Sequence, residues 1–397
     1  MAGPPPLHDL LVLDLSRVLS GPYCTMQLAD MGARVIKVEQ PAGGDETRAW
    51  GPPFLGGESA YFLSVNRNKE SLTLNLKHPD GASLAARLAA RADVLVENFR
   101  PGTLTRFGLD YPTLAARNPG LVYCSISGFG QDGPSRNLPG YDMVIQAEGG
   151  LMDITGPADG SGFRLGVAVA DIFTGVLAAQ GVTLALLARQ RSGLGQLVDV
   201  AMLDSVAALL SYQAGLQFAG QEPRRLGNRH PTIAPYDSFE TSDGEIVLAV
   251  GNDLQWGRFC SAAGVEGLAA DARFATNPAR VREHHALRAA IGPILRGATT
   301  SAWVARLRAA EVPCGAVRSV GEVLADPQLA SREMIARVDH PSAGPIDLLG
   351  VPIKLSASPG SVRTPPPTLG QHTDTILRDD LGLGPDDIER LRHEGAI

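Results

Sequence analysis

The N-terminal half of the chain alternates between short apolar segments and segments with helical periodicity. The apolar segments lie at residues 10–15, 34–39, 71–76, 93–97, 121–126 and 196–200, and the helical ones at 20–31, 79–91, 171–188 and 203–217. Continuous apolar strands separated by helices are typical of a mostly parallel sheet covered on both faces. The loops after the carboxyl ends of such strands are the expected ligand side.

With 397 residues, the chain is too long for one ordinary core. A polar linker follows residue 220, and then the pattern changes to a hairpin at 236–250, turning at Asp243-Gly244, and helices near 256–263, 285–295 and 300–310. We therefore predict an α/β protein with a mostly parallel Rossmann-like sheet in a large domain (1–220), a smaller α+β domain (225–325) and a C-terminal return to the large domain (326–397). In the tail we expect a helix at 320–338, a strand at 351–355 and two closing helices.

Composition narrows the function classes. A net charge of −7 argues against a general nucleic-acid binder. The four cysteines are far apart and form no C-x-x-C, so neither a disulfide framework nor a zinc site is indicated. The long apolar segment at 165–188 contains Asp171, Thr174 and Gln180, which favours a core helix over a membrane span. We expect a cytoplasmic protein with no nucleic-acid or membrane partner.

Lysine is concentrated near the N-terminus. Lysine occurs only at Lys37, Lys69, Lys77 and Lys354, which makes the N-terminal end a candidate anion site. Four segments, at 16–22, 43–48, 66–77 and 97–102, each place cations or amides beside a predicted strand end. One such segment alone is usually a solvated loop, but together they indicate a site for an elongated, phosphate-bearing ligand.

The segment Gly128-Phe-Gly130-Gln-Asp-Gly133 matches the dinucleotide fingerprint G-x-G-x-x-G and follows a predicted strand. Pro134 and Pro139 make the next segment a loop, so no helix N-terminus is available for a pyrophosphate. We therefore do not predict a nucleotide site of the Rossmann type there.

Asp171 lies at the start of the long apolar helix. A carboxylate among Val, Ala and Ile side chains must be paired, serve as a helix cap, or be kept for chemistry. From the residue alone, a plain helix cap and a catalytic carboxylate both stay open.

Taken together, these strand-end segments and four further motifs resemble the class III CoA-transferases (CaiB/BaiF family). The motifs are Pro139-Gly-Tyr-Asp142, Gly166-Val-Ala-Val-Ala-Asp171, Gly227-Asn-Arg-His230 and Leu369-Gly-Gln-His-Thr373. The resemblance runs from about Leu7 to the C-terminus. Residues 47–53 and 61–69 are most similar to the succinyl-CoA:glutarate CoA-transferase branch.

The resemblance implies an interlocked homodimer that acts on an acyl-CoA and a free carboxylic acid, with the coenzyme A thioester as substrate and no permanently bound cofactor. It assigns the catalytic carboxylate to Asp171. It assigns coenzyme A contacts to Leu74, Lys77, Asn98, Phe99, Arg100, Arg106 and Tyr141. The chain departs from the family pattern at Gln40, where some members carry a basic residue, and it lacks the glycine-rich run before the small domain. Gly149-Gly150 is the nearest counterpart of that run.

The implied reaction passes coenzyme A through an aspartyl-linked intermediate, by covalent catalysis that needs no metal. Two alternatives remain: an acyl-CoA racemase or lyase of the same superfamily, and a catalytically silent acyl-CoA binder. The racemases use a His base where this chain has Tyr141, and a phenol is a poor base at neutral pH. If the acceptor is a diacid, its free carboxylate needs a cation. Arg17 and Arg48 are the candidates, with salt bridges to Asp14, Asp45 or Glu46 as the alternative role for each.

Overall fold

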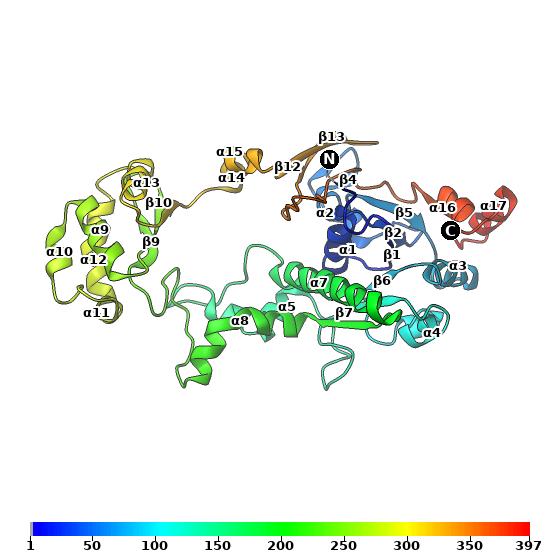
Figure 1. Cartoon of the computed structure of the whole chain (residues 1–397), viewed down its shortest axis with the longest axis horizontal. Coiled ribbons are helices and arrows are strands. Elements are labelled where there is room, and N and C mark those ends of the chain that lie inside the picture. Colours follow the sequence, from blue (N-terminus) through cyan, green and yellow to red (C-terminus); the bar gives the residue numbers. More distant parts are fainter. Residues whose placement is uncertain (1–2) are drawn as a thin grey trace. The chain divides into compact units, whose positions relative to one another are not determined.

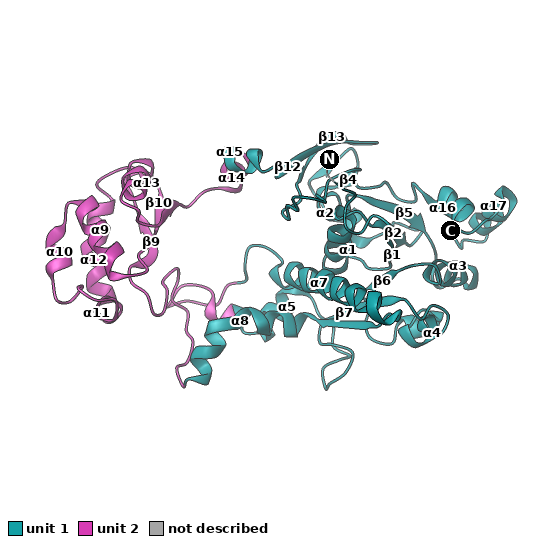
Figure 2. Cartoon of the chain, viewed as in Figure 1, with its two compact units in different colours: residues 1–151, 164–219, 327–397 teal, residues 152–163, 220–326 magenta. Residues whose placement is uncertain are grey.

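The computed structural model describes residues 3–397, and the chain divides into two compact units (Figure 2). Unit 1 comprises the chain up to Leu151, then Arg164–Ala219 and Pro327–Ile397, and unit 2 comprises Met152–Phe163 and Gly220–Asp326. The sequence-based prediction placed residues 152–163 in the large domain, whereas the structure assigns them to the smaller unit. This segment is held there by Arg225 Nη1, which donates to the Asp153 carbonyl (2.7 Å), and by Gly227 N, which donates to the Gly156 carbonyl (3.0 Å).

A six-stranded parallel sheet forms the centre of unit 1 (Figure 1). Its strands are β1 (Leu11–Asp14), β2 (Arg34–Glu39), β5 (Lys69–Thr73), β6 (Val94–Glu97), β7 (Val122–Ser127) and β8 (Leu197–Ala201), in the order β5-β2-β1-β6-β7-β8. The sheet extends in opposite directions from β1 and β6. A crevice at such a switch point, beyond the carboxyl ends of the strands, is where doubly wound sheets bind ligands. The predicted Rossmann-like parallel sheet is confirmed.

Helices cover both faces of this sheet. On one face, α1 (Ser20–Asp30) and α7 (Val169–Ser192) pack against the side chains of Val12, Val94 and Val122. On the other, α3 (Pro79–Ala89), α4 (Tyr111–Ala115), α16 (Thr373–Asp379) and α17 (Pro385–His393) share a core that includes strand residues such as Leu13 and Leu95. Successive strand residues point to opposite faces, so a sheet covered on both sides has continuously apolar strands.

Shorter elements complete unit 1. They are η1 (Glu46–Ala49), β3 (Phe54–Leu55), β4 (Glu58–Ser59), α2 (Ala60–Val65), η2 (Leu104–Phe107), α5 (Asp142–Glu148), α8 (Met202–Phe218), α15 (Pro327–Ser331), β12 (Ile335–His340) and β13 (Gly344–Leu349). The short helix α6 (Leu151–Ile154) begins at the last residue of the first unit 1 segment.

Unit 2 has its own core beneath a three-stranded antiparallel sheet, ordered β11-β10-β9. Its elements are β9 (Tyr236–Glu240), β10 (Glu245–Ala249), α9 (Asp253–Ala263), α10 (Glu266–Ala270), α11 (Asn277–Arg282), α12 (His284–Leu295), α13 (Thr300–Ala309), β11 (Cys314–Ala316) and α14 (Val320–Leu324). The predicted hairpin is confirmed: Thr241 N donates to the Gly244 carbonyl across its turn (2.9 Å).

Two predictions for the tail are wrong. The helix expected at 320–338 is broken into α14 and α15 and is followed by strand β12, because Pro327 interrupts the helical pattern. The strand expected at 351–355 lies earlier, as β13, which pairs antiparallel with β12. Ile346 and Leu348 alternate along β13 and are buried against Leu63, and this packing determines the hairpin.

Helix α7 is, within residues 3–397, the one helix long and apolar enough to cross a membrane. Ala178, Val182 and Ala185 are buried in the core shared with α1 and the sheet. Leu184 and Leu187, in contrast, are exposed. The helix therefore has one face in the core of unit 1 and one unpaired apolar face.

Candidate active site

Two cavities in unit 1 lie at the predicted ligand edge of the sheet. The larger has a volume of about 690 Å³ and includes Ser16, Leu74 and Lys77 in its wall. The smaller, of about 150 Å³, includes Ser20 and Asp171. Arg17, Glu46 and Phe99 line both cavities. Loops after β1, β2, β5 and β6 thus form one continuous lining.

Asp171 lies in the first turn of α7, where the helix dipole favours a negative charge. Its carboxylate receives a side-chain and a backbone hydrogen bond from Ser20, the first residue of α1. Burial and then the nearby Asp142 carboxylate raise the pKa of Asp171 to about 6, while the bonds from Ser20 act in the opposite direction. Asp142 itself accepts a hydrogen bond from Ala170 N (2.9 Å), so it also caps α7. Asp171 is therefore a half-buried carboxylate that ionises near neutral pH.

Close packing of α1 against α7 brings Ser20 to Asp171. Gly175, one turn after Asp171, faces α1 so closely that an added Cβ would lie 2.6 Å from the Ser20 carbonyl oxygen. At Gly21 an added Cβ would lie 2.2 Å from Ser16 Cβ. Both positions exclude any larger residue unless the backbone moves, which explains the glycine in each motif.

The predicted coenzyme A contacts are distributed over both cavities. Leu74 and Lys77 line the larger cavity, Asn98, Arg100 and Tyr141 line the smaller, and Phe99 lines both. Arg106 lines neither: it is exposed in η2, whose neighbour Phe107 does reach the larger cavity. Gln40 is also in the wall of the larger cavity, where its Nε2 donates to the Gly44 carbonyl (3.2 Å).

The two arginines predicted to bind a substrate carboxylate have different surroundings. The Arg17 side chain is half exposed, lies over the Phe99 ring at 5.6 Å and forms an ion pair with Glu46. Arg48 lines neither cavity. Its guanidinium is paired with Glu39 (2.7 Å) and Glu58 (3.2 Å) and packs over the ring of Phe62 (3.6 Å). The ion pair with Glu46 is the alternative role considered for Arg17, whereas Arg48 is paired with acids other than the three considered. Of the two arginines, only Arg17 lines the cavities and can meet a ligand there.

The lysine-rich N-terminal end contributes less to the site than the sequence suggests. Lys37 is buried and paired with Asp45 (2.8 Å), and Lys69 is buried and paired with Asp14 (3.1 Å). Burial lowers the pKa of Lys69 to about 8, against the opposing attraction of Asp14. Of the three lysines near the N-terminus, only the third, Lys77, is exposed. Sequence position alone did not reveal that the other two are internal cations.

In the segment at 128–140, Gly128 and Gly140 allow two stretches of backbone to cross in close contact. An added Cβ at Gly128 would lie 2.6 Å from Gly140 Cα. This crossing places Tyr141, whose side chain is 65% exposed, in the wall of the cavity that contains Asp171. Gly149, part of the nearest counterpart of the missing glycine-rich run, is closely packed: an added Cβ there would lie 2.3 Å from Val206 Cγ1.

Sequence reasoning missed three neighbours of Asp171. Ser20 is a hydrogen-bond donor to it, Asp142 is a like charge, and Tyr61 on α2 lies close enough for the Asp171 charge to contribute, after burial, to raising its pKa to about 12. The motif Pro139-Gly-Tyr-Asp142 was the available signal for Asp142. In the described part of the chain, no three His, Cys, Asp or Glu side chains are grouped as a metal site would require.

Comparisons with known proteins give consistent matches over nearly the whole chain. The model of CoA-transferase family III matches residues 7–373. The chain is 44% identical to a succinate–glutarate CoA-transferase of Agrobacterium fabrum, over 94% of this chain and 96% of that one. It is 40% identical to the human succinyl-CoA:glutarate CoA-transferase, over 99% of this chain and 90% of that one. A crystal structure of a CAIB/BAIF family protein from Brucella suis superposes with a TM-score of 0.87 at 42% identity, covering 96% of this chain and all of that one.

Proposed function

The chain belongs to CoA-transferase family III, and from this we propose that it moves coenzyme A from succinyl-CoA to a short dicarboxylic acid such as glutarate, through a covalent intermediate on Asp171. The observation that carries the proposal is the position of Asp171. It is a half-buried carboxylate in the wall of a cavity that shares Arg17, Glu46 and Phe99 with a second, larger cavity. An elongated thioester needs such an arrangement, with the reacting group at one end of its site.

The chemistry requires a carboxylate that can both attack and be attacked. The Asp171 carboxylate attacks the thioester carbonyl of the donor, the C–S bond breaks, and a mixed anhydride and the coenzyme A thiolate form. The thiolate attacks the aspartyl carbonyl, which releases the donor acid and leaves an aspartyl thioester. The acceptor acid then takes coenzyme A by the same two steps in reverse order, and Asp171 is regenerated.

Oxyanions that develop at the aspartyl carbonyl need hydrogen-bond donors. The Ser20 amide and hydroxyl already bond to the Asp171 carboxylate, and the N-terminal end of α7 carries a partial positive charge beside it. These groups support the assignment of Asp171 as the nucleophile because they lie where negative charge develops during the reaction.

The larger cavity suits the nucleotide part of coenzyme A. Lys77 offers a cation for phosphate, and Phe99 and Phe107 offer apolar surface. Arg100, in the smaller cavity, provides a second exposed cation.

A diacid acceptor retains one free carboxylate while the other reacts. Arg17 is the candidate to bind it, because its half-exposed guanidinium lies in the wall that both cavities share. Binding would exchange Glu46 for the substrate carboxylate as the partner of this arginine.

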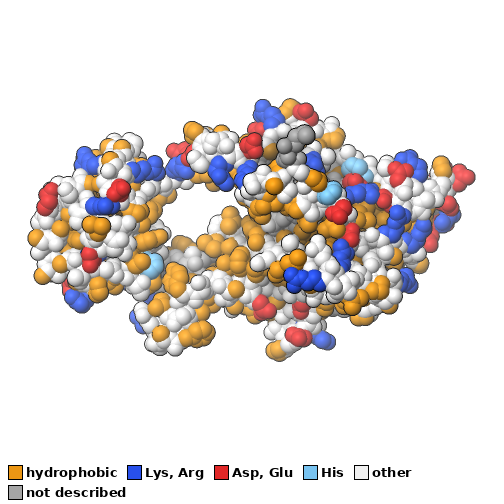
Figure 3. Space-filling view, in the orientation of Figure 1, with side chains coloured by type: hydrophobic (Ala, Val, Ile, Leu, Met, Phe, Trp, Pro, Cys, Tyr) orange, Lys and Arg blue, Asp and Glu red, His pale blue; other side chains and the backbone are white. Residues whose placement is uncertain are grey.

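The proposal extends to an interlocked homodimer. Large apolar side chains are exposed along α7, α8 and β8, among them Leu184, Leu187, Leu197 and Phe218, whose exposed fraction is 89%. Hydrophobic side chains gather over α8 and the adjoining part of α7 (Figure 3). A second copy would bury such a surface.

We also place the protein in the cytoplasm, where its four free thiols fit reducing conditions.

The test is a screen of acceptor acids against succinyl-CoA, with detection of each new thioester by mass. We expect glutaryl-CoA and thioesters of other short diacids from the unmutated protein, and none from the Asp171→Ala variant. Equal use of butyrate and glutarate would contradict the diacid assignment, and full exchange by Asp171→Ala would contradict the mechanism.

A further inference from the structure

The turn between β1 and α1 is held in an uncommon conformation. Val18 has φ 68°, in the left-handed region. Among the described residues other than glycine, positive φ occurs also at Asn68, Ser211, Glu311 and Glu333, so Val18 is the only β-branched residue with this conformation. A β-branched residue rarely adopts this conformation, so the surroundings must impose it.

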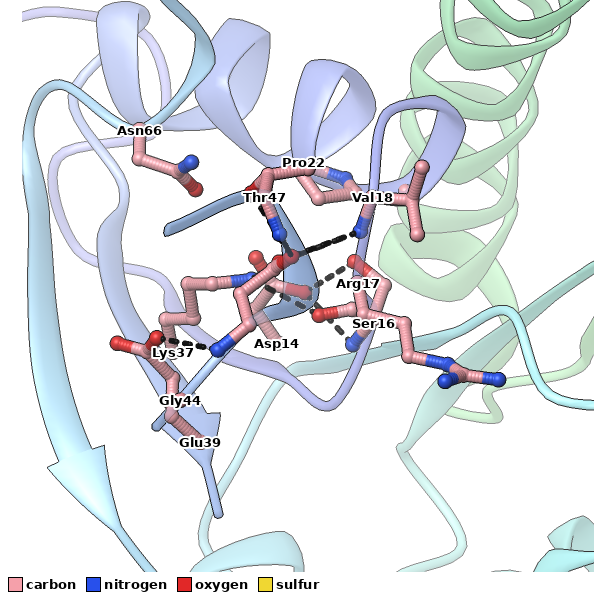
Figure 4. Close-up of polar contacts among 12 residues, drawn as sticks. Asp14, Ser16, Arg17, Val18, Pro22, Lys37, Glu39, Gly44, Thr47 and Asn66 are labelled. Carbon is pink, nitrogen blue, oxygen red and sulfur yellow. Dashed lines mark hydrogen bonds and ion pairs between the residues drawn. The ribbon is translucent and has the colours of Figure 1, made fainter. Parts of the chain in front are cut away.

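Side chains from β1, β2 and the loops after β2 and β6 fix this turn. The Ser16 amide donates to Asp14 (2.9 Å), the Ser16 carbonyl accepts from Lys37 (2.9 Å), the Arg17 amide and carbonyl bond to Asn98 (2.9 and 2.7 Å), and the Val18 amide donates to Asp45 (3.2 Å to each oxygen). Figure 4 shows the turn from Ser16 to Val18 among the side chains of Asp14, Lys37 and Thr47. Every backbone polar group from the Ser16 amide to the Val18 amide is thus bound by a side chain.

Asp45 is the partner that acts on the strained residue itself. Its carboxylate is buried and also accepts from Lys37 (2.8 Å) and from the amide and hydroxyl of Thr47 (3.0 and 2.8 Å). Although burial opposes its ionisation, Lys37 and Thr47 hold the pKa of Asp45 at about 2. It is therefore an anion at any working pH, and a charged acceptor binds an amide more strongly than a neutral one.

The turn leads directly to Ser20, the residue that donates hydrogen bonds to Asp171. Two residues after Val18, Ser20 begins α1 and gives its amide and hydroxyl to Asp171. We propose that Asp45 is a positioning residue for the transfer reaction: its carboxylate holds Val18 in the left-handed conformation and thereby fixes Ser20 against Asp171. Asp45 touches no reacting atom in this account, and the inference rests on the proposed role of Asp171.

A double-mutant cycle with Val18→Gly tests this. Glycine adopts positive φ without strain, so it makes the carboxylate unnecessary for the conformation. We expect Asp45→Ala to lower kcat about tenfold with little change in KM for acyl-CoA, and to cost less than about threefold when Val18→Gly is already present. The same loss in both backgrounds would overturn the proposal.

Two further variants keep the test decisive. Asp30→Asn breaks another buried ion pair, with Arg67 (2.7 Å), and should lower the melting temperature without lowering kcat. If Asp45→Ala fails to fold because Lys37 is left unpaired, Lys37→Met with Asp45→Ala removes both charges, and the cycle with Val18→Gly is repeated in that protein. Asp171→Ala assayed in parallel separates the two claims: its full activity would refute the proposed function, whereas a dead Asp171→Ala with no coupling in the cycle would refute only the role of Asp45.

The acid limb of kcat/KM gives a second readout. Asp171 is faced by Ser20 from α1, Asp142 from α5 and Tyr61 from α2, and the other charged residues that line the same cavity are Arg17, Glu46 and Arg100. Bonds from Ser20 lower the pKa of Asp171, so their loss in Asp45→Ala should move the limb to higher pH. Asp30→Asn should leave the limb unmoved, and an unmoved limb in Asp45→Ala would count against the proposal.

Discussion

At the scale of single residues, the nucleophile we assign is controlled by neighbours with opposite effects. Asp142 and burial raise the pKa of Asp171 to about 6, and Ser20 opposes them. A carboxylate with a raised pKa is a stronger nucleophile once ionised, but a smaller share of it is ionised at acidic pH. The pH dependence of the reaction therefore reports on this pair.

Replacing Asp142 by Asn should move the acid limb of kcat/KM to lower pH. The reason is that the like charge that raises the pKa of Asp171 is gone, while the Asn oxygen can still accept from Ala170 N. Comparison with the unmutated protein on the same substrates cancels the titration of the substrates. A limb that moves to higher pH would show that Asp171 is not the group that titrates.

Replacing Arg17 by Met should raise KM for diacids far more than for monoacids. Loss of a charge-assisted pair costs about 1.5–3 kcal/mol, which corresponds to roughly tenfold to a hundredfold in KM. Arg48→Met serves as the comparison, because its partners Glu39 and Glu58 predict a loss of stability rather than of diacid selectivity. Equal KM increases for both classes of acid would remove Arg17 from the acceptor site.

Sequence patterns marked Asp171 as a carboxylate at the start of an apolar helix, whereas Lys77 and Phe99 were assigned only through the family resemblance. They could not predict that Lys37 and Lys69 are internal. Whether a lysine at a strand end meets solvent or a carboxylate depends on which acidic side chains the fold brings to it. Here Asp45 reaches Lys37 from the loop after β2, and Asp14 reaches Lys69 from β1, which β2 separates from β5 in the sheet.

At the scale of elements, the contact of α1 with α7 assembles the site. Gly175→Ala should lower both the melting temperature and kcat, because its Cβ would lie 2.6 Å from the Ser20 carbonyl and push the helices apart. Overpacking of this kind costs about 1–3 kcal/mol. Calorimetry and steady-state assays of the same preparation measure both effects.

Gly257→Ala is the matched control. Gly257 lies within α9, and an added Cβ there meets nothing within 4 Å. The same substitution should therefore stabilise the protein by about 0.5–1 kcal/mol, since alanine has the higher helix propensity. If Gly175→Ala behaves like Gly257→Ala, the close approach of α1 and α7 is not what holds the site.

Periodicity predicted β1, β2, β6 and β7 well because these strands are almost entirely buried and therefore mostly apolar. It failed in the tail. There most residues of β12 and β13 are half-buried or exposed, and Ile346 and Leu348 are the buried apolar residues of the hairpin. A two-stranded hairpin with so few apolar residues is defined by packing against Leu63, which no local pattern reveals.

At the scale of the whole molecule, the exposed apolar surface of α7, α8 and β8 predicts a homodimer of twice 41.7 kDa. Interlocked subunits cannot separate while folded. Two differently tagged preparations, mixed and incubated, should therefore form no mixed dimers until they are unfolded and refolded together. Ready exchange in the native state would contradict interlocking, and a monomeric mass would contradict the dimer.

Covalent attachment of the substrate to Asp171 is the measurement that tests the central claim most directly. The protein is incubated with succinyl-CoA without an acceptor, treated with hydroxylamine, digested and analysed by mass spectrometry. We predict a hydroxamate on the peptide that contains Asp171, its absence without succinyl-CoA, and no corresponding adduct in Asp171→Ala. A protein that exchanges coenzyme A at full rate while Asp171 stays unmodified, or that carries the adduct on another residue, would contradict the account.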